Sequence, residues 1–461
     1  MRPLHIVILA AGKGTRMRSE RSKVLHRMAG RPLIDHVLDA ARALQPASIT
    51  IVVGHQADTV KAAVASDACR FVVQEPQLGT GHALLQAEPA LNGASGDVLL
   101  LSGDVPLLRA ETMASLVEAH RRAGAAATVL TASIANPDGY GRIVRDKGSI
   151  ARIVEHRDAT EAERAISEIN SGVYVFALEP LFAALRKIGS SNAQGEYYLP
   201  DLAGLYRGQG LTVETMTLPD ADEIRGVNSR AELAALSRDL RMKTCETLMA
   251  SGVTIEDPAT AYIDATVEVG PDTIIHPGVS LEGATRIGAR CEIHSGSRLV
   301  NAVLADDVLV RNHCVIVDST VDAKATIGPF AHVRPGSSIG PDAHVGNFVE
   351  LKKTSMAAGA KANHLSYLGD ATIGSRVNVG AGTITCNYDG KTKHQTVIED
   401  EAFIGSDTQL VAPVRVGKGA YVAAGSSIVE DVPAGALAVT RGRQINKEGW
   451  VEKHARQKRG Q

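Results

Sequence analysis

The chain has 461 residues, of which 44% are hydrophobic and 22% charged, a composition that fits a soluble globular protein of two or three domains. The net charge of −2 gives no reason to expect a nucleic-acid partner, and no apolar run is long enough for membrane insertion. The five scattered cysteines form no CxxC motif, so the sequence argues against a disulfide framework or a zinc site and favours the reducing cytoplasm.

The first part of the chain alternates predicted strands with predicted helices. Residues 5–10 are expected to form a buried strand. Further strands are expected at residues 49–53, 70–73, 98–101 and 126–131, and helices at residues 57–65, 81–88 and 111–122. This alternation predicts an α/β domain with a mostly parallel sheet. Ligands of such sheets bind beyond the carboxyl ends of the strands, where the loops 10–16, 74–80 and 102–106 fall.

The glycine-rich turn after the first strand is a candidate phosphate-binding loop. Gly12 and Gly14 leave backbone N–H groups open to an anion. A dinucleotide-binding motif would need a third glycine where Met17 stands, and the chain has no Walker A motif. Three nearby cations suit a triphosphate, namely Lys13, Arg16 and Lys23. A tight strand–helix turn with basic surface residues is the alternative interpretation.

Asp104 follows another predicted strand and brings a carboxylate to the same edge of the sheet. Mg²⁺ prefers carboxylate oxygen and takes substrate phosphates and water as its other ligands. The sequence therefore suggests a magnesium site, although an Asp that begins a turn before Pro106 has the same pattern.

A long helix is predicted for residues 229–249, which are rich in helix formers. Ser229 is a candidate N-cap, and Glu232 stands three residues later, where a capping box needs a glutamate. We expect this helix to join the α/β domain to the next domain.

From residue 263 to about residue 432, an aliphatic residue returns at every sixth position. Neither the helical period nor simple alternation produces this spacing. It is typical of a hexapeptide repeat, which forms a parallel β-helix whose aliphatic side chains point inward and stack from coil to coil. The second run of the repeat places Leu309 and Val315 inside the prism.

The phase of the repeat breaks near residues 299–309, 351–373 and 379–398. Insertions in solenoids become loops on one face, often the binding face, and the second and third breaks are rich in polar residues, so we predict a site there. His364 lies in the second break and suits a general base near neutral pH, although a single histidine is more often a surface or packing residue.

Several motifs between Leu9 and Asn228 resemble those of the sugar-phosphate nucleotidyltransferases. They are Leu9-Ala-Ala-Gly-Lys-Gly-Thr-Arg-Met17, Lys23-Val24-Leu25, Gln74-x4-Gly79-Thr80, Gly103-Asp104, Gly139-Tyr-Gly-Arg142, Ile153-Val-Glu155, Glu168-Ile-Asn170-Ser-Gly172 and Gly226-Val-Asn228. Followed by a hexapeptide domain, they are similar in order and spacing to the family of bacterial bifunctional N-acetylglucosamine-1-phosphate uridyltransferases and glucosamine-1-phosphate acetyltransferases. The resemblance covers nearly the whole chain.

The resemblance implies an architecture and two activities. A Rossmann-like α/β nucleotidyltransferase domain with a mostly parallel sheet would span residues 1–228, a linker helix residues 229–250, and a left-handed parallel β-helix with a C-terminal tail residues 251–461. The β-helix would transfer acetyl from acetyl-CoA to glucosamine 1-phosphate. The first domain would then transfer uridylyl from UTP with Mg²⁺ as cofactor. The product would be UDP-N-acetylglucosamine, a precursor of peptidoglycan and lipopolysaccharide.

The resemblance also assigns roles to individual residues. For UTP and N-acetylglucosamine 1-phosphate it implies Leu9, Ala10, Ala11, Gly12, Arg16, Lys23, Gln74, Gly79, Thr80, Ser102, Gly103, Asp104, Gly141, Glu155, Asn170 and Asn228. Arg16 and Lys23 would neutralise the triphosphate, and Asp104 and Asn228 would hold Mg²⁺. Some members have an aromatic residue where this chain has Ser102, so no stacking contact is expected there.

For the second activity the resemblance makes His364 the general base. It assigns Arg334, Lys352, Tyr367 and Asn378 to glucosamine 1-phosphate, and Ala381, Asn387, Tyr388, Ser406, Ala424 and Arg441 to acetyl-CoA. Related acyltransferases form trimers with sites between neighbouring prisms, so a homotrimer is implied.

Two alternatives belong to other classes of protein. A single-activity sugar-1-phosphate nucleotidyltransferase with a structural or regulatory β-helix would have no use for a polar break that carries His364. A purely structural solenoid with a decayed first domain would not keep Gly12, Arg16, Lys23 and Asp104 together.

Overall fold

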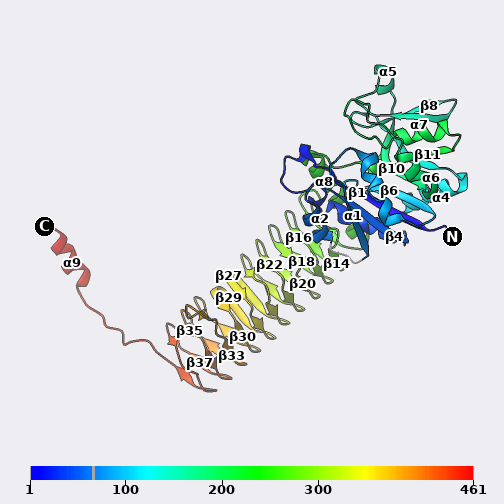
Figure 1. The fold of residues 1–461 in the computed structure, drawn as a ribbon. Helices are drawn as coiled ribbons and strands as arrows, with labels where there is room; N and C mark the ends of the chain where they lie inside the picture. The colour runs from blue at the N-terminus through cyan, green and yellow to red at the C-terminus, as the bar shows by residue number, and fades with distance from the viewer. Residues whose placement is uncertain (1, 65–67, 460–461) are drawn as a thin grey trace. The chain divides into compact units, whose positions relative to one another are not determined.

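The computed structural model describes residues 2–64 and 68–459. The chain forms two compact units, Met1–Arg238 and Asp239–Gln461, and the division falls inside the long helix α8 (Arg230–Ala250). In Figure 1 the first unit runs from blue to green and the second from green to red. No helix among the described residues is long and apolar enough to cross a membrane.

The first unit is built on a nine-stranded sheet with the central order β11-β7-β10-β6-β1-β4-β5, to which β8 and β9 are added beside β10. Its strands are β1 (Leu4–Ala10), β4 (Ser48–Val53), β5 (Cys69–Val73), β6 (Asp97–Ser102), β7 (Ala127–Ser133), β8 (Arg142–Asp146), β9 (Ser149–Val154), β10 (Glu168–Ala177) and β11 (Val213–Leu218). In the central order only β10 runs antiparallel to its neighbours. The predicted mostly parallel α/β sheet is confirmed.

Helices cover both faces of this sheet, because successive strand residues point to opposite sides. Ile6 and Ile8 pack with α1, α2 and α4, whereas Val7 packs with α3, α6 and α7. The helices are α1 (Leu33–Ala43), α2 (Ala57–Val64), α3 (Thr80–Leu85), α4 (Ala110–Ala123), α5 (Glu161–Arg164), α6 (Leu178–Leu185) and α7 (Asp201–Gly208). Short pieces are β2 (Arg27–Met28), β3 (Arg31–Pro32) and the 3₁₀ turns η1 (Thr15–Met17), η2 (Lys23–Leu25), η3 (Glu88–Leu91) and η4 (Ala221–Ile224).

Two predicted helix ends need comment. The helix expected at residues 57–65 is α2, but Ala65 itself lies outside the described residues. The helix expected at residues 81–88 ends at Leu85, and η3 follows with Pro89 at its start. Proline disfavours the α conformation of the residue before it and lacks an amide hydrogen. The prediction of one continuous helix from residue 81 to residue 88 is therefore wrong.

The N-terminus of α8 carries the capping box that the sequence predicts. The Glu232 amide donates to Ser229 Oγ at 3.2 Å, and the Ser229 amide donates to Glu232 Oε2 at 3.0 Å. These bonds satisfy two of the amides that a helix start leaves without partners.

The second unit is a parallel β-helix with three ladders of short strands, all paired in parallel and enclosing one apolar core. The first ladder holds β12 (Thr254–Ile255), β15 (Ile274–Ile275), β18 (Glu292–Ile293), β21 (Leu309–Val310), β24 (Thr326–Ile327), β31 (Asn378–Val379), β34 (Phe403–Ile404), β37 (Tyr421–Val422) and β39 (Leu437–Ala438). The second holds β13 (Tyr262–Ile263), β16 (Ser280–Glu282), β19 (Arg298–Val300), β22 (Val315–Val317), β25 (His332–Val333), β32 (Ile384–Cys386), β35 (Gln409–Val411) and β38 (Ser427–Ile428). Strands β27 (His344–Lys352) and β29 (Lys361–Gly369) run through both of these ladders.

The third ladder holds β14 (Glu268–Val269), β17 (Arg286–Ile287), β20 (Val303–Leu304), β23 (Thr320–Val321), β26 (Ser338–Ile339), β28 (Ser355–Met356), β30 (Ala371–Ile373), β33 (Thr396–Ile398) and β36 (Val414–Val416). Figure 1 shows these stacked strands as the repeating coils of the second unit. Beyond β39, a segment without regular structure leads to α9 (Trp450–Arg459). The hexapeptide interpretation is confirmed.

The first phase break is a shortened coil, and the first two predicted inward residues after it, Leu309 and Val315, are wrong by one position, whereas Val321 and Ile327 are buried as predicted. Val269 pairs with Ile287 and Ile287 with Leu304, so the second of these coils is one position shorter than the first. As a result Val310 and Ile316 are fully buried, whereas Leu309 and Val315 are only partly buried. A strict six-residue count of the sequence does not reveal that one corner of the coil is a residue shorter.

The second phase break is not a loop, which corrects the prediction for residues 351–373. Strands β27 and β29 pair along their whole length, and the inward positions of this coil are taken by Met356, Ala362 and Leu368. The pairing of Met356 with Ile373 shows that this coil is shortened in the same way as the one that ends at Leu304. Its core residues include a methionine and an alanine, so the aliphatic pattern in the sequence fades while the prism continues.

The third phase break is a true insertion. The third ladder passes from Ile373 directly to Ile398, and the stretch between them is longer than an ordinary coil such as the one from Val269 to Ile287. The extra residues form a loop in which Tyr388 bridges to Lys393 in antiparallel fashion. The prediction of a loop here is confirmed.

Candidate active sites

A cavity of about 540 Å³ lies where β1 and β6 end, at the carboxyl edge of the parallel strands. Its lining contains ten residues that the sequence resemblance assigns to the nucleotide: Leu9, Ala10, Ala11, Gly12, Lys23, Gln74, Gly79, Thr80, Ser102 and Asp104. It also contains residues that sequence reasoning gave no role there: Val24, Gln77, Ala83 and Glu196. Gln77 and Val24 stand inside or beside quoted motifs, whereas no sequence signal points to Glu196.

The glycine positions in and near the first loop require glycine for different structural reasons. At Gly12 an added Cβ would meet no atom within 4 Å, so its backbone faces open space. Gly14 has φ of 59° and an added Cβ would lie 2.8 Å from Lys23 Cβ. Gly103 does not line the cavity. A Cβ added at Gly103 would lie 3.1 Å from Val24 Cγ1, so the missing side chain leaves room for Val24. The loop therefore exposes backbone at Gly12 and brings Lys23 close at Gly14.

Four polar side chains that the resemblance names meet beside this cavity. Lys23 Nζ donates to Asp104 Oδ2, and to Asn228 Oδ1 at 3.2 Å. Arg16 Nη2 also donates to Asn228 Oδ1, at 2.8 Å. The carboxylate and the amide oxygen thus converge on one positive group. Because both are oxygen ligands of the kind that Mg²⁺ takes, Asp104 and Asn228 fit a divalent cation that would compete with Lys23 for this position.

The loop from Gln74 to Thr80 is held by close contacts. Gln74 is buried, and its Nε2 donates to the Gly79 carbonyl at 2.9 Å. Gly79 has φ of 102°, and an added Cβ would lie 2.9 Å from Glu196 Cβ, so only glycine fits. The amide of Gln74 therefore has a fixed direction at the cavity wall, as recognition of a base edge requires.

Gly141, Glu155 and Asn170, which the resemblance assigns to the sugar, lie together. A Cβ built on Gly141 would be 3.4 Å from Asn170 Cβ and 3.5 Å from Glu155 Oε1. The backbone amide of Asn170 donates to the Gly141 carbonyl at 2.9 Å. Glu155 lines a separate cavity of about 350 Å³. Burial, and then the carboxylates of Asp158, Asp201 and Glu196, raise the pKa of the Glu155 carboxyl.

Glu155→Gln is expected to raise the melting temperature at neutral pH. A carboxyl whose pKa is higher in the folded than in the unfolded state stabilises the fold below the unfolded pKa, about 4.3, and loses that contribution as pH rises through the folded pKa. Glutamine is neutral at every pH and avoids this loss. Melting temperatures from about pH 4 to about pH 8 should diverge from the wild type as pH rises. The exposed Glu161→Gln is the matched control, and parallel curves for Glu155→Gln and the wild type would contradict the expectation.

In the second unit, four predicted residues stack at the corner between the first and second ladders, one in each coil: His364, Ala381, Ser406 and Ala424. Backbone hydrogen bonds link these corners. The Gly382 amide donates to the Leu365 carbonyl at 2.8 Å, the Asp407 amide to Ala381 at 2.7 Å, and the Gly425 amide to Ser406 at 2.8 Å. Arg441 Nη1 donates to the Ala424 carbonyl at 2.8 Å. The histidine is exposed at one end of this column and the arginine lies at the other.

A second polar group gathers on the second ladder and the corner after it. Arg334 Nη1 donates to Glu350 Oε1 at 2.8 Å, and Glu350 is the register partner of Tyr367. The insertion brings Lys393 to Lys352, whose neighbouring ammonium lowers the pKa of Lys393. Asn387 Nδ2 from the same insertion donates to Asp370, and the Tyr367 hydroxyl packs over Gly369. Glu350 and Asp370 belong to this group, although sequence reasoning gave them no role.

Two of the assigned residues lie apart from their expected companions. Asn378 stands on the first ladder between Lys361 and Phe403, not on the second ladder with Arg334 and Lys352. Tyr388 is exposed in the insertion, where its hydroxyl donates to the Gly390 carbonyl at 2.7 Å. A single chain therefore brings together only part of the set assigned to the acetyl-transfer site.

The fold and these two groups of side chains define a class of protein, a nucleotidyltransferase domain joined to a hexapeptide β-helix. Residues 6–196 match the family model described as the MobA-like NTP transferase domain, and residues 258–337 match the one described as the GMPPB C-terminal domain.

Curated relatives match nearly the whole chain. "Bifunctional protein GlmU" of Koribacter versatilis is 50% identical over 99% of this chain and 99% of the relative. The proteins of the same name from Pelobacter propionicus and Trichlorobacter lovleyi are each 51% identical, over 96% and 97% of this chain and 97% and 98% of their own lengths. The chain belongs to the family of the bifunctional protein GlmU.

Proposed function

We propose that this chain is a bifunctional enzyme that makes UDP-N-acetylglucosamine. Its β-helix acetylates glucosamine 1-phosphate, and its α/β domain couples the product to the uridylyl group of UTP. The observation that carries this proposal is the presence of two separate groups of chemically suited side chains, one in each unit, in a chain that matches a bifunctional relative over 99% of both lengths.

In uridylyl transfer, an oxygen of the sugar 1-phosphate attacks the α-phosphorus of UTP and pyrophosphate leaves. Such transfers depend on positioning and charge neutralisation rather than on a covalent protein nucleophile. The open backbone at Gly12 receives the phosphates, and Arg16 and Lys23 neutralise their charge. Asp104 and Asn228 hold Mg²⁺, which supplies further neutralisation of the phosphate oxygens when it is bound.

In acetyl transfer, the amine of glucosamine 1-phosphate attacks the thioester carbonyl of acetyl-CoA. The carbon–sulfur bond breaks, His364 takes the amine proton, and that proton goes to the departing thiolate. Arg334, Lys352 and Lys393 bring positive charge for the sugar phosphate. The small residues of the corner column leave room for the coenzyme, with Arg441 placed for one of its phosphates.

We also propose that the enzyme is a homotrimer of the cytoplasm. A ladder of side chains runs along the corner beside His364: His313, Phe330, Phe348 and Leu365. Phe330 and Phe348 stack with ring centroids 5.4 Å apart and are 47% and 56% exposed, and Leu365 is 64% exposed. All four residues adopt positive φ, which non-glycine residues rarely do. An exposed ladder of mostly apolar side chains fits burial against a second copy of this chain, which would also supply Asn378 to the site.

Phe348→Ser is expected to weaken this assembly. Burial of one phenylalanine side chain contributes about 2 kcal/mol, so each interface should lose about 30-fold in affinity. Sedimentation of the wild type should give the mass of three chains, and the variant should dissociate as it is diluted. Val303→Ser changes an exposed valine on the third ladder and serves as the control. A monomeric wild type would contradict the trimer, and a variant that stays assembled at every concentration would remove this corner from the interface.

Two assays on the purified protein test the proposed function. One contains glucosamine 1-phosphate and acetyl-CoA and measures free thiol. The other contains N-acetylglucosamine 1-phosphate, UTP and Mg²⁺ and measures pyrophosphate. Activity in both is expected. Pyrophosphate without thiol would leave a nucleotidyltransferase whose β-helix has only a structural or regulatory role.

A further inference from the structure

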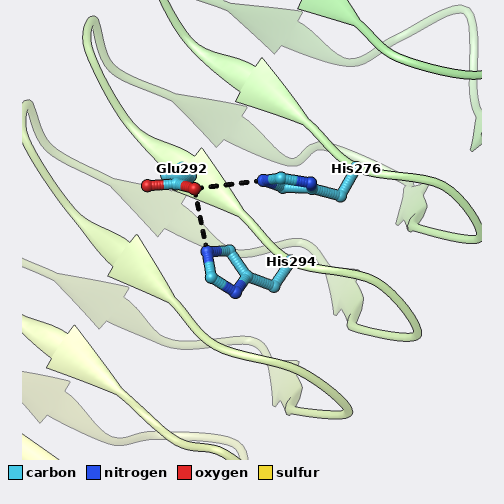
Figure 2. Close-up of side chains that lie close together, drawn as sticks. All are labelled: His276, Glu292 and His294. Carbon is cyan, nitrogen blue, oxygen red and sulfur yellow. Dashed lines mark hydrogen bonds and ion pairs between the residues drawn. The ribbon is translucent and has the colours of Figure 1, made fainter.

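His276, Glu292 and His294 form a cluster on the outside of the β-helix, in two successive coils near its start (Figure 2). His276 Nε2 lies 3.1 Å from Glu292 Oε1, and His294 Nε2 lies 3.0 Å from the same oxygen. The two imidazole rings meet edge to face with centroids 4.7 Å apart. These three side chains belong to neither of the groups described above.

The opposite ring nitrogens face oxygen atoms as well. His276 Nδ1 lies 3.0 Å from Glu256 Oε2, and His294 Nδ1 lies 3.4 Å from Asn312 Oδ1. Both of these oxygens can accept a hydrogen bond from the ring Nδ1. In the tautomer whose Nδ1 donates to these oxygens, the Nε2 lone pairs of His276 and His294 face the carboxylate of Glu292. In this tautomer two imidazole nitrogens and a carboxylate oxygen converge, and a cation between them would have three ligands.

We propose that this cluster binds a divalent transition-metal ion of the zinc class. Imidazole nitrogen and carboxylate oxygen are the ligands that such ions prefer, and two histidines with one glutamate is a known zinc ligand set. Bonds of about 2.0–2.1 Å in a tetrahedral site separate neighbouring ligand atoms by about 3.4 Å. The two nitrogen–oxygen distances, 3.1 and 3.0 Å, are close to this value, and all three ligand atoms lie within 4.8 Å of one another. Glu256 and Asn312 act as the outer partners that hold each ring with Nε2 toward the metal.

The side chains of His276, Glu292 and His294 are 24%, 45% and 28% exposed, which leaves a coordination position for water and a path for the ion to enter. Because the ligands and their outer partners come from successive coils, the bound ion ties these coils together at the start of the solenoid. The scattered cysteines argued against a zinc site from sequence, and this cluster escapes that argument because it uses histidines that stand a full coil apart.

The test uses the full-length protein without a histidine tag, with excess Mg²⁺ present to occupy oxygen-only sites. Titration with Co²⁺ should produce the visible absorption of a tetrahedral site with nitrogen ligands, and Zn²⁺ should abolish it by competition. His294→Asn and Glu292→Gln should each weaken Zn²⁺ binding by roughly 100-fold or more, and Glu256→Gln, an outer partner, by roughly 10-fold or more. His332→Asn, an exposed histidine on the second ladder, should bind as the wild type does.

Thermal unfolding gives a second readout. Saturating Zn²⁺ should raise the melting temperature of the wild type and of His332→Asn but not of Glu292→Gln. Because Glu292 lies at the surface, Glu292→Gln should fold, and its melting temperature without Zn²⁺ reports any folding defect separately from the loss of binding. Absence of tetrahedral cobalt absorption in the wild type would overturn the proposal. Equal Zn²⁺ affinity in the wild type, His294→Asn and Glu292→Gln would overturn it as well.

Discussion

Replacing His364 by alanine is expected to lower the rate of acetyl transfer by about 10²–10⁴-fold and to leave uridylyl transfer unchanged. The amine loses the base that removes its proton, whereas the cavity at β1 and β6 belongs to the other unit. The thiol assay measures the loss, and the pyrophosphate assay on the same preparation reports whether the α/β unit is intact.

The matched control for this prediction is His332→Ala, which removes another exposed histidine of the β-helix and should keep both activities. Sedimentation of His364→Ala should match that of the wild type, so that lost assembly is not mistaken for lost chemistry. Equal loss of both activities in His364→Ala would contradict two independent sites. Retained acetyl transfer would remove His364 from the role of base.

Asp104→Asn is expected to lower Mg²⁺-dependent uridylyl transfer by roughly 10³-fold and to leave acetyl transfer unchanged. The variant keeps the size of the side chain but removes the charge that faces Lys23 Nζ and that would ligate the ion. Several kcal/mol of charge stabilisation depend on the metal, and a loss of about 1.4 kcal/mol lowers the rate tenfold. Rates measured over a series of Mg²⁺ concentrations should show a higher requirement for the ion in the variant.

Asp58→Asn is the control for this variant, because Asp58 is exposed on α2 and pairs only weakly with Lys61. An Asp104→Asn enzyme with the wild-type rate and the wild-type Mg²⁺ requirement would exclude Asp104 as a metal ligand. A loss that extra Mg²⁺ fully restores would confine the role of the carboxylate to binding the ion.

Much of the fold follows from the sequence because its two periodicities are strong. The buried strand before Gly12 and the alternation after it predict the parallel sheet, and the six-residue repeat predicts the prism. The register of the prism does not follow from the sequence. A coil that loses one corner residue moves Val310 inward in place of Leu309 without changing the local composition. The break around His364 failed as a loop prediction for a related reason: Ala362 and Met356 fill core positions without the aliphatic signature.

The candidate sites follow from the sequence where their residues lie in short motifs. Gly12 and Asp104 stand in such motifs directly after strands whose ends the sheet brings to one edge, and Lys23 joins them from the 3₁₀ turn η2. Glu196, Glu350 and Asp370 reach their sites only through pairings between distant segments, which no local pattern encodes. The proposed zinc-class cluster also could not be predicted from a local pattern, because His276 and His294 meet only where one coil lies on the next.

The corner column of His364, Ala381, Ser406 and Ala424, which we propose for the coenzyme, has a length that the spacing of the coils fixes. Neighbouring coils are about 4.8 Å apart, so the three steps from His364 to Ala424 span roughly 14 Å. This distance changes only in whole coils, because a partial coil would turn the inward residues outward. Single substitutions therefore leave the length of this column unchanged, and a longer or shorter coenzyme arm would need a whole coil more or less.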